Sequence, residues 1–272
     1  MTNDDTMRAD AALAARGLAP SRERARSLIE AGLATVNGMP IGKPARRVSE
    51  ADRLAVIGDT HPYVSRGGLK LEKALNVFGA DVSGLVCVDV GASTGGFTDV
   101  LLRSGARHVY AVDVGTAQLH ESLRVDPRVT SMERVNARTL HRAMFPEPPT
   151  LAVMDVSFIS IRLILPALFE VLGGKGRVIS LIKPQFEAGR QRIGKNGIVT
   201  SAEAHRDVLK AIVDFTPTLG WQVTGLDFSP IAGGDGNVEF LADLRPEDCC
   251  KATMNDAVID DVVRKAHGAK LR

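Results

Sequence analysis

The sequence predicts an α/β fold with a mostly parallel, seven-stranded sheet, preceded by a small α+β module. From about residue 67 onward, short apolar runs rich in β-branched residues alternate with amphipathic segments. This alternation is typical of a parallel sheet covered by helices. The last two apolar runs follow each other without a helix between them, which predicts an antiparallel hairpin at one edge of the sheet.

Each predicted strand is an apolar run bounded by turn-forming residues. The strands are expected at residues 86–90, 108–113, 128–132, 151–154, 177–182, 221–228 and 238–243. The predicted helices carry apolar residues at helical spacing, and they span residues 68–78, 96–104, 161–172 and 203–215. Thr200 and Glu203 form a capping-box pattern before the last helix. The apolar face of that helix is expected to comprise Ala204, Val208, Ala211, Ile212 and Phe215.

Residues 1–60 are expected to form a separate module of two helices and a β-ribbon. The first helix is predicted around residues 11–18, and the second begins after Ser21, a favoured N-cap residue. The dipeptide Asn37-Gly38 between two apolar runs predicts a hairpin. We expect residues 61–66 to be a linker, residues 67–246 to form the second domain, and residues 247–272 to form a C-terminal helix or tail.

The composition is typical of a globular protein of the cytoplasm. Lys and Arg number 34 against 32 Asp and Glu, so the net charge of +2 does not by itself indicate a nucleic-acid partner. The three cysteines lack metal-ligand spacing, which favours a reducing compartment and predicts no metal site. No signal peptide is predicted, and no apolar run approaches the ~20 residues that span a membrane.

Basic residues are concentrated in the N-terminal module. Residues 16–53 contain eight Lys or Arg and four Asp or Glu. A solvated helix face would explain this excess, and so would contact with nucleic-acid phosphates. The candidate RNA-binding residues are Arg16, Arg22, Arg24, Arg26, Lys43, Arg46 and Arg47 in this module, and Arg66, Arg190, Arg192 and Lys195 in the second domain.

The segment 86–102 predicts a ligand site at the turn between a strand and a helix. Its glycines, Gly91, Gly95 and Gly96, are spaced G-x-x-x-G-G, whereas dinucleotide-binding turns read G-x-G-x-x-G. The Asp89 carboxylate would repel a pyrophosphate but suits an amino group or a sulfonium. S-adenosylmethionine (SAM) carries both groups. The predicted cofactor site comprises Asp89, Gly91, Ala92, Ser93, Gly95, Gly96, Phe97, Thr98, Asp113, Asn136 and Asp155.

Polar residues end several predicted strands, where open α/β sheets bind ligands. The Asp113 carboxylate would accept hydrogen bonds from both ribose hydroxyls, although capping the next turn is its ordinary role. Asn136 follows the third strand, where an adenine edge would lie, and Asp155 ends the fourth. Lys183 ends the fifth strand, and its partial desolvation would favour a neutral amine that can accept a proton.

The complete set of motifs resembles one family over residues 8–245. Lys70, Asp155, Lys183 and Glu239 occur in the order K-D-K-E of FtsJ-like ribose 2'-O-methyltransferases. The N-terminal module contains R-x-D-x-x-L, GL-x-x-S-R-x-x-A-x-x-L-I-x-x-G and V-N-G in order, and it resembles the S4-like RNA-binding domain. The motifs VSRGGLKL, DVGASTGGFTDVLL, AVDVG, DVSFIS, IKPQFE and GNVEF resemble those of the TlyA (haemolysin-A-like) rRNA methyltransferases. One departure lies at residues 61–64, which read HPYV where some members have R-x-W-V.

The resemblance implies a Rossmann-like, SAM-dependent methyltransferase fold. It further implies methylation of a cytidine 2'-hydroxyl in 16S or 23S rRNA, with ribosomal RNA or ribosomal subunits as partners. Lys70, Asp155, Lys183 and Glu239 are then the catalytic candidates. Lys183 is our candidate base, and Lys70 is an alternative proton acceptor.

Three other functions stay open at this point. A ribosome-assembly factor with little catalysis would keep the RNA-binding module. An NAD-dependent oxidoreductase would use Asp113, 22 residues beyond Gly91, for its ribose. A membrane-active haemolysin has no support in a spanning or basic amphipathic segment.

Overall fold

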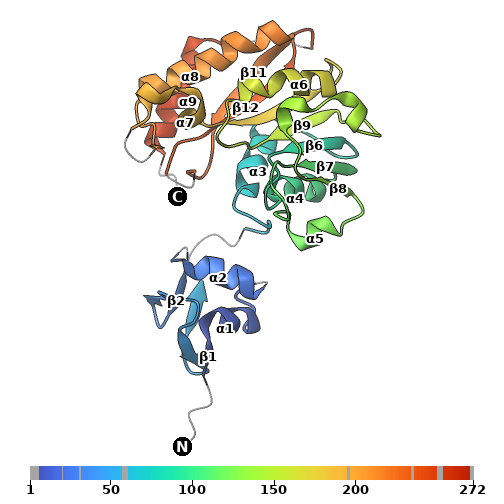
Figure 1. Cartoon of the computed structure of the whole chain (residues 1–272). Coiled ribbons are helices and arrows are strands. Elements are labelled where there is room, and N and C mark those ends of the chain that lie inside the picture. Colours follow the sequence, from blue (N-terminus) through green and yellow to red (C-terminus); the bar gives the residue numbers. More distant parts are fainter. Residues whose placement is uncertain are drawn as a thin grey trace, which may run out of the picture. The chain divides into compact units, whose positions relative to one another are not determined.

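The chain consists of two compact units, Met1–Thr60 (unit 1) and His61–Arg272 (unit 2). The computed structural model describes residues 6–19, 21–30, 32–56, 61–194, 197–233, 236–249 and 254–269 (Figure 1).

Unit 1 combines two helices with short antiparallel strands. Its described elements are β1 (Thr6–Arg8), α1 (Ala9–Ala15), α2 (Arg22–Glu30), β2 (Ala34–Val36), β3 (Met39–Pro40), β4 (Arg47–Ser49) and β5 (Leu54–Val56). The predicted hairpin is present: β2 pairs with β3, and Asn37 and Gly38 at its turn have φ values of 52° and 81°. This left-handed pair is what a tight two-residue hairpin turn requires.

Strands β1, β4 and β5 were not predicted. Each has only three residues, and β1 pairs with β4 across more than thirty residues of chain, from Met7 to Val48. Strands this short carry too few residues for a recognisable alternation, and their partners are distant in sequence. Leu13, Ile29 and Ile41 are among the residues that form the core of this unit.

Unit 2 contains the predicted mostly parallel, seven-stranded sheet. Its strands are β6 (Val86–Val90), β7 (His108–Val112), β8 (Val129–Met132), β9 (Leu151–Met154), β10 (Arg177–Ile182), β11 (Trp221–Phe228) and β12 (Phe240–Pro246). They lie in the order β11-β12-β10-β9-β6-β7-β8, and β12 is antiparallel to both of its neighbours. The predicted fold class is therefore confirmed.

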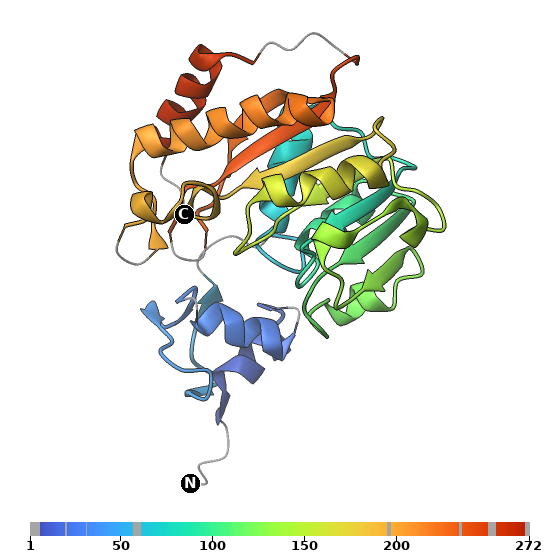
Figure 2. The ribbon, with the colours of Figure 1, turned by 45° about the horizontal axis from the view of Figure 1, so that its top comes forward.

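Helices cover both faces of this sheet (Figure 2). One face packs against α3 (Gly68–Val77), α4 (Gly96–Arg103) and α5 (Glu121–Arg124). The other packs against α6 (Leu165–Val171), α8 (Ala202–Phe215) and α9 (Asp256–Gly268). Shorter helical segments are α7 (Pro184–Glu187), Ala137–Thr139, Arg142–Met144, Ile161–Leu163, Arg190–Arg192 and Thr216–Leu219.

Several details of the predicted helices were wrong. Ser201, not Thr200, caps α8, because its side chain accepts a hydrogen bond from the Ala204 N–H. Ala211 and Phe215 are only partly buried, and His205 and Leu209 take their places in the core. The predicted helix 161–172 is divided into a 3₁₀ turn and α6, whose first turn contains Pro166; proline lacks an N–H and is tolerated there.

The strand order reverses between β6 and β9. From β6 the chain continues to β7 and β8 on one side, and then returns to β9 and β10 on the other. A reversal of this kind opens a crevice at the carboxyl ends of the two central strands. The residues that follow β6 and β9 therefore face each other, and the Asp155 N–H donates to the Val90 carbonyl at 3.0 Å.

Candidate active site

The loop after β6 requires glycine at two positions. Gly91 has a φ of +83°, and a Cβ placed on it would lie 2.5 Å from the Asp155 backbone oxygen. Gly95 precedes α4 with a φ of +96°, and a Cβ there would lie 2.3 Å from the Leu123 side chain. Both positions combine the left-handed region with close neighbours, so larger residues would push the loop away from β9 and α5.

Two cavities lie at this edge of the sheet. The larger has a volume of about 520 Å³, and the smaller about 230 Å³. Both are lined by Gly91, Ser93, Asp155 and Ser157. The larger extends over the ends of β7 and β8 to apolar side chains such as Ile164, and the smaller reaches Lys183. An elongated ligand with an apolar ring at one end and polar groups at the other would fit this shape.

Asp113 and Asn136, two of the polar residues predicted for the cofactor site, line the larger cavity. The two Asp113 oxygens accept hydrogen bonds from the Ser93 and Gly115 N–H groups, both at 2.7 Å. These bonds fix the carboxylate at the cavity wall, and each oxygen has a further lone pair for a hydroxyl donor. Asn136 uses its side-chain oxygen to cap the Ala137–Thr139 turn.

Asp89 lies beneath the loop, fully buried. One of its oxygens accepts a hydrogen bond from the Thr98 hydroxyl at 2.6 Å, and the other has no hydrogen-bond partner among the residues that the structure describes. Burial raises its pKa to about 7, and the nearby carboxylates of Asp155 and Asp113 add to the rise. A cation placed above this loop would be stabilised by the carboxylate.

The four residues of the K-D-K-E set meet at the carboxyl end of β9 and β10. The Lys183 ammonium lies 2.6 Å from Asp155 Oδ1, and the Lys70 ammonium lies 3.7 Å from Asp155 Oδ2. Lys70 also donates to Glu239 Oε2 at 2.6 Å. Asp155 is therefore shared by two lysines, one on each oxygen.

The two lysines differ in their surroundings. Burial opposes the charge on Lys70, but the carboxylates of Asp155 and Glu239 outweigh it and raise its pKa. Lys70 is thus held as a cation. Lys183 lines the smaller cavity, where a reacting group could approach its amine.

The residues that line these cavities include Ser157 and Phe158, which were not predicted. Ser157 accepts a hydrogen bond from the Lys183 ammonium at 2.9 Å and lines both cavities. Phe158 lines the larger cavity, is 91% exposed and has a φ of 64°. Their place two and three residues after Asp155, in the loop that follows β9, is a signal that could have identified them. The exposure of Phe158 has no sequence signal, because apolar residues in a loop usually turn inward.

Residues 61–66, the expected linker, belong to unit 2 and contact its helices α3 and α4. The Tyr63 hydroxyl donates to Glu72 at 2.6 Å, and the Val64 N–H donates to Asp99 at 2.9 Å. A Cβ on Gly68 would lie 2.6 Å from the Tyr63 ring, so glycine lets this ring lie against α3. The aromatic residue of this segment therefore fixes the start of unit 2.

The predicted RNA-binding cations are mostly exposed, and several have intramolecular partners. Arg16 donates to the carbonyls of Ser49 and Asp52. Arg26 pairs with Glu30 in unit 1, and Arg192 pairs with Asp207 in unit 2. The exposed cations include Arg22, Lys43, Arg46, Arg47, Arg66 and Arg190, Arg24 is partly buried, and Lys195 lies outside the described residues. Their contact with RNA stays a prediction.

Comparison with known proteins identifies the family of both units. The FtsJ-like methyltransferase profile matches residues 63–245, and the S4 domain profile matches residues 7–54. The chain belongs to the TlyA family of FtsJ-like methyltransferases. It is 42% identical over 260 residues to the 16S/23S rRNA (cytidine-2'-O)-methyltransferase TlyA of Mycobacterium tuberculosis, covering 95% of this chain and 96% of that one.

Other proteins similar to this chain carry a different description. Hemolysin A of Brachyspira hyodysenteriae is 42% identical over 87% of this chain and 98% of its own length. A solved Streptococcus thermophilus structure, described as a candidate hemolysin, has a TM-score of 0.76 at 48% identity and covers 97% of this chain and 96% of its own. Among the described residues, no helix is long and apolar enough to cross a membrane. The same residues hold no group of three or more His, Cys, Asp or Glu suited to a metal ion.

Proposed function

We propose that the protein transfers the methyl group of SAM to the 2'-hydroxyl of a cytidine in 16S or 23S rRNA. The observation that carries this proposal is the meeting of Lys70, Asp155, Lys183 and Glu239 beside a cavity built on Gly91 and Asp113. The relative named as a 16S/23S rRNA (cytidine-2'-O)-methyltransferase supports the substrate, which would place the protein in the cytoplasm.

The residues at the cavity fit SAM. Asp113 would hold the ribose hydroxyls, Asn136 the adenine edge, and the loop from Gly91 to Phe97 the methionine end, above the buried Asp89. When bound, SAM supplies an electrophilic methyl group on a sulfonium. Transfer of this group to the hydroxyl oxygen would break the carbon–sulfur bond and would leave S-adenosylhomocysteine as the second product.

Lys183 accepts the hydroxyl proton in this proposal. With both lysines charged, the set of two lysines and two carboxylates is neutral. A sulfonium in the cavity adds one positive charge, which favours loss of a proton from one lysine. Lys70 is retained as a cation by Glu239 at 2.6 Å, which leaves Lys183 as the proposed proton acceptor. Ser157, which accepts a bond from the Lys183 ammonium, orients its amine toward the cavity.

Methylation mapping tests the proposed function. The purified chain is incubated with labelled SAM and with 16S and 23S rRNA, free or within ribosomal subunits, and the labelled nucleotide is located. We expect label on a cytidine whose 3'-phosphodiester becomes resistant to alkaline hydrolysis. Label on a base, or RNA binding without any transfer, would contradict the proposal; the second result would favour the assembly-factor function.

Binding of SAM should release a proton near neutral pH. Asp89 has a pKa raised to about 7, and the ammonium and sulfonium of SAM would lower it. SAM affinity should therefore rise as pH increases through 7 and level off above it. Calorimetry at pH 6.5 in buffers of different ionisation enthalpy measures the released proton. Asp89→Asn should remove both the release and this pH dependence, and an unchanged release in that variant would contradict the assignment.

Phe158 should act as a stacking surface for the target base. Its ring is exposed at the cavity mouth, 5.1 Å from the Phe186 ring, and its left-handed backbone is unusual for a bulky residue. A base removed from its stack is commonly received by an aromatic ring, worth about 1–3 kcal/mol. Phe158→Ala should lower kcat/KM for RNA about tenfold, whereas Phe158→Tyr should not. A larger change in SAM affinity than in RNA kinetics would assign the ring to adenine instead.

A further inference from the structure

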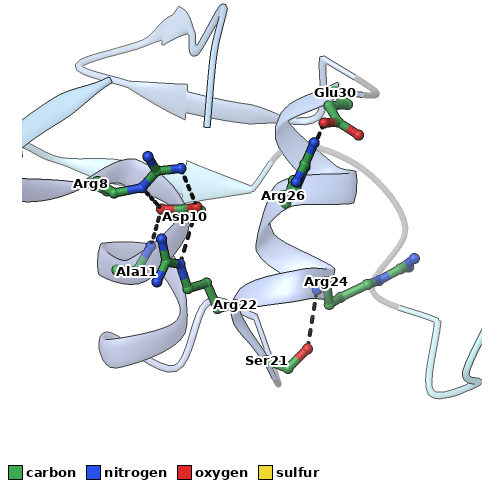
Figure 3. Close-up of polar contacts among 8 residues, drawn as sticks. All are labelled: Arg8, Asp10, Ala11, Ser21, Arg22, Arg24, Arg26 and Glu30. Atoms are coloured by element: carbon green, nitrogen blue, oxygen red, sulfur yellow. Dashed lines mark hydrogen bonds and ion pairs between the residues drawn. The ribbon is translucent and has the colours of Figure 1, made fainter. Parts of the chain in front are cut away.

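A buried carboxylate lies beside Arg22, one of the predicted RNA-binding residues of unit 1. Asp10, in the first turn of α1, is 3% exposed. Its oxygens accept hydrogen bonds from Arg8 Nε at 3.0 Å, Arg8 Nη2 at 2.9 Å and Arg22 Nε at 3.2 Å (Figure 3). The Ala11 N–H donates a further bond at 2.9 Å. One carboxylate therefore connects arginines from β1 and α2 that are fourteen positions apart in the chain.

The two arginines remain accessible although one side of each is fixed. Their side chains are 41% and 59% exposed, against 4% for Asp10. A guanidinium has five N–H donors, and the bonds to Asp10 use two from Arg8 and one from Arg22. The hydrogen bonds from Arg8, then from Arg22, lower the pKa of Asp10 to about 2, so the carboxylate is ionised at any pH where RNA is intact.

The fold brings a second basic segment to the same corner. Arg8 lies opposite Arg47 in the β1–β4 pair, and the Ala9 N–H donates to the Arg46 carbonyl at 2.8 Å. The Asp10 N–H donates to the Pro44 carbonyl at 3.2 Å. Arginines from β1 and α2 therefore contact one carboxylate, and the backbone of a third basic segment lies beside them. Without the carboxylate, two neighbouring guanidiniums would repel each other and lose their common orientation.

We propose that Asp10 is a positioning residue that holds Arg8 and Arg22 as a pair of guanidiniums for a backbone phosphate of RNA. The proposal rests on the proposed RNA-methylating function and adds Arg8 to its RNA-binding residues. Planar guanidiniums suit phosphate oxygens, and fixing them before binding removes an ordering cost from association. Arg26 and Glu30 on α2 provide a contrast, because both members of that ion pair are more than half exposed (Figure 3).

Matched carboxylate-to-amide variants of the full chain test this role. Asp10→Asn and Glu30→Gln each remove one negative charge beside an arginine of unit 1. RNA affinity is measured with protein-free 16S and 23S transcripts across a range of salt concentrations. Glu30→Gln should leave the RNA affinity within about twofold or strengthen it. An exposed ion pair such as Arg26–Glu30 does little to orient its arginine, and the variant raises the net positive charge. Asp10→Asn should weaken it about tenfold, despite the same gain in charge.

A double-mutant cycle separates positioning from a structural effect. Arg8→Ala combined with Arg22→Ala should lower the salt slope by about 1. In that background Asp10→Asn should cause no further loss, because it acts through the two arginines. If Asp10→Asn unfolds unit 1, the double variant Arg8→Lys with Arg22→Lys tests the same role. This variant keeps both positive charges but lacks the Nε hydrogen bonds to Asp10, and it should lose about tenfold in RNA affinity, as expected for Asp10→Asn.

The outcomes distinguish this inference from the function on which it rests. If the wild-type chain methylates and binds rRNA but Asp10→Asn behaves like Glu30→Gln, or the lysine variant binds like wild type, the positioning role of Asp10 is wrong. An equal further loss from Asp10→Asn in the double-alanine background would also overturn it. If the wild-type chain neither binds nor methylates rRNA, the proposed function itself fails.

Discussion

Replacing Lys183 with alanine should lower methyl transfer at least about a thousandfold, while SAM affinity changes less than about threefold. The amine lies 2.6 Å from Asp155 and 2.9 Å from Ser157, and it lines the smaller cavity rather than the adenosyl end. Its removal takes away the proposed proton acceptor and leaves the wall of the cofactor cavity in place. Single-turnover methylation and SAM calorimetry on the same preparation measure the two quantities.

Lys183→Arg distinguishes a base from a fixed cation. Arginine keeps the positive charge beside Asp155 but does not lose its proton in proteins. The variant should therefore be as inactive as Lys183→Ala. Transfer at more than about a tenth of the wild-type rate would show that charge alone suffices, and the role of base would pass to another group. Lys73→Ala is the matched control, since Lys73 lies on α3 but pairs with Asp227 away from the cavities.

Glu239→Gln should destabilise unit 2 by about 3 kcal/mol and remove activity. The side chains of Lys70 and Glu239 are only 10% and 3% exposed, and the variant leaves a buried cation with Asp155 at 3.7 Å as its remaining carboxylate. The single tryptophan, Trp221, is buried in unit 2, so its fluorescence during urea unfolding reports on this unit. Asp227→Asn, which breaks the more exposed pair with Lys73, should cost less than about 1 kcal/mol.

Removing both charges should separate stability from catalysis. In Lys70→Met with Glu239→Leu, no uncompensated charge remains, so the free energy of unfolding should recover most of the loss. Methyl transfer should stay absent, because Lys70, one of the two cations that share Asp155, is gone. Equal stability of Glu239→Gln and wild type would contradict the argued importance of the buried pair.

The sequence predicted the site best where a strand pattern is followed at once by residues that can bind a ligand. Strand 86–90, the glycines after it and the polar residues that end later strands were all predictable, because each strand end is marked by a change from apolar to polar residues. The approach of Lys70 to Glu239 was not, since 169 residues separate them. Only the family resemblance paired them. The burial of Asp10 was not predicted either, because an acid near arginines usually lies in solvent, and this burial depends on where α2 begins.

The single reversed strand has a consequence for how the site is assembled. In a wholly parallel sheet, residues that follow the strands lie at the edge that carries the active site. A residue that precedes a strand lies at the opposite edge, roughly 20 Å away for a strand of this length. Because β12 runs backwards and Phe240 stands opposite Ile182, the residue before it, Glu239, emerges next to Lys183. The direction of β12 thus places the amino end of the seventh strand beside Asp155 and Lys183, which follow the carboxyl ends of β9 and β10.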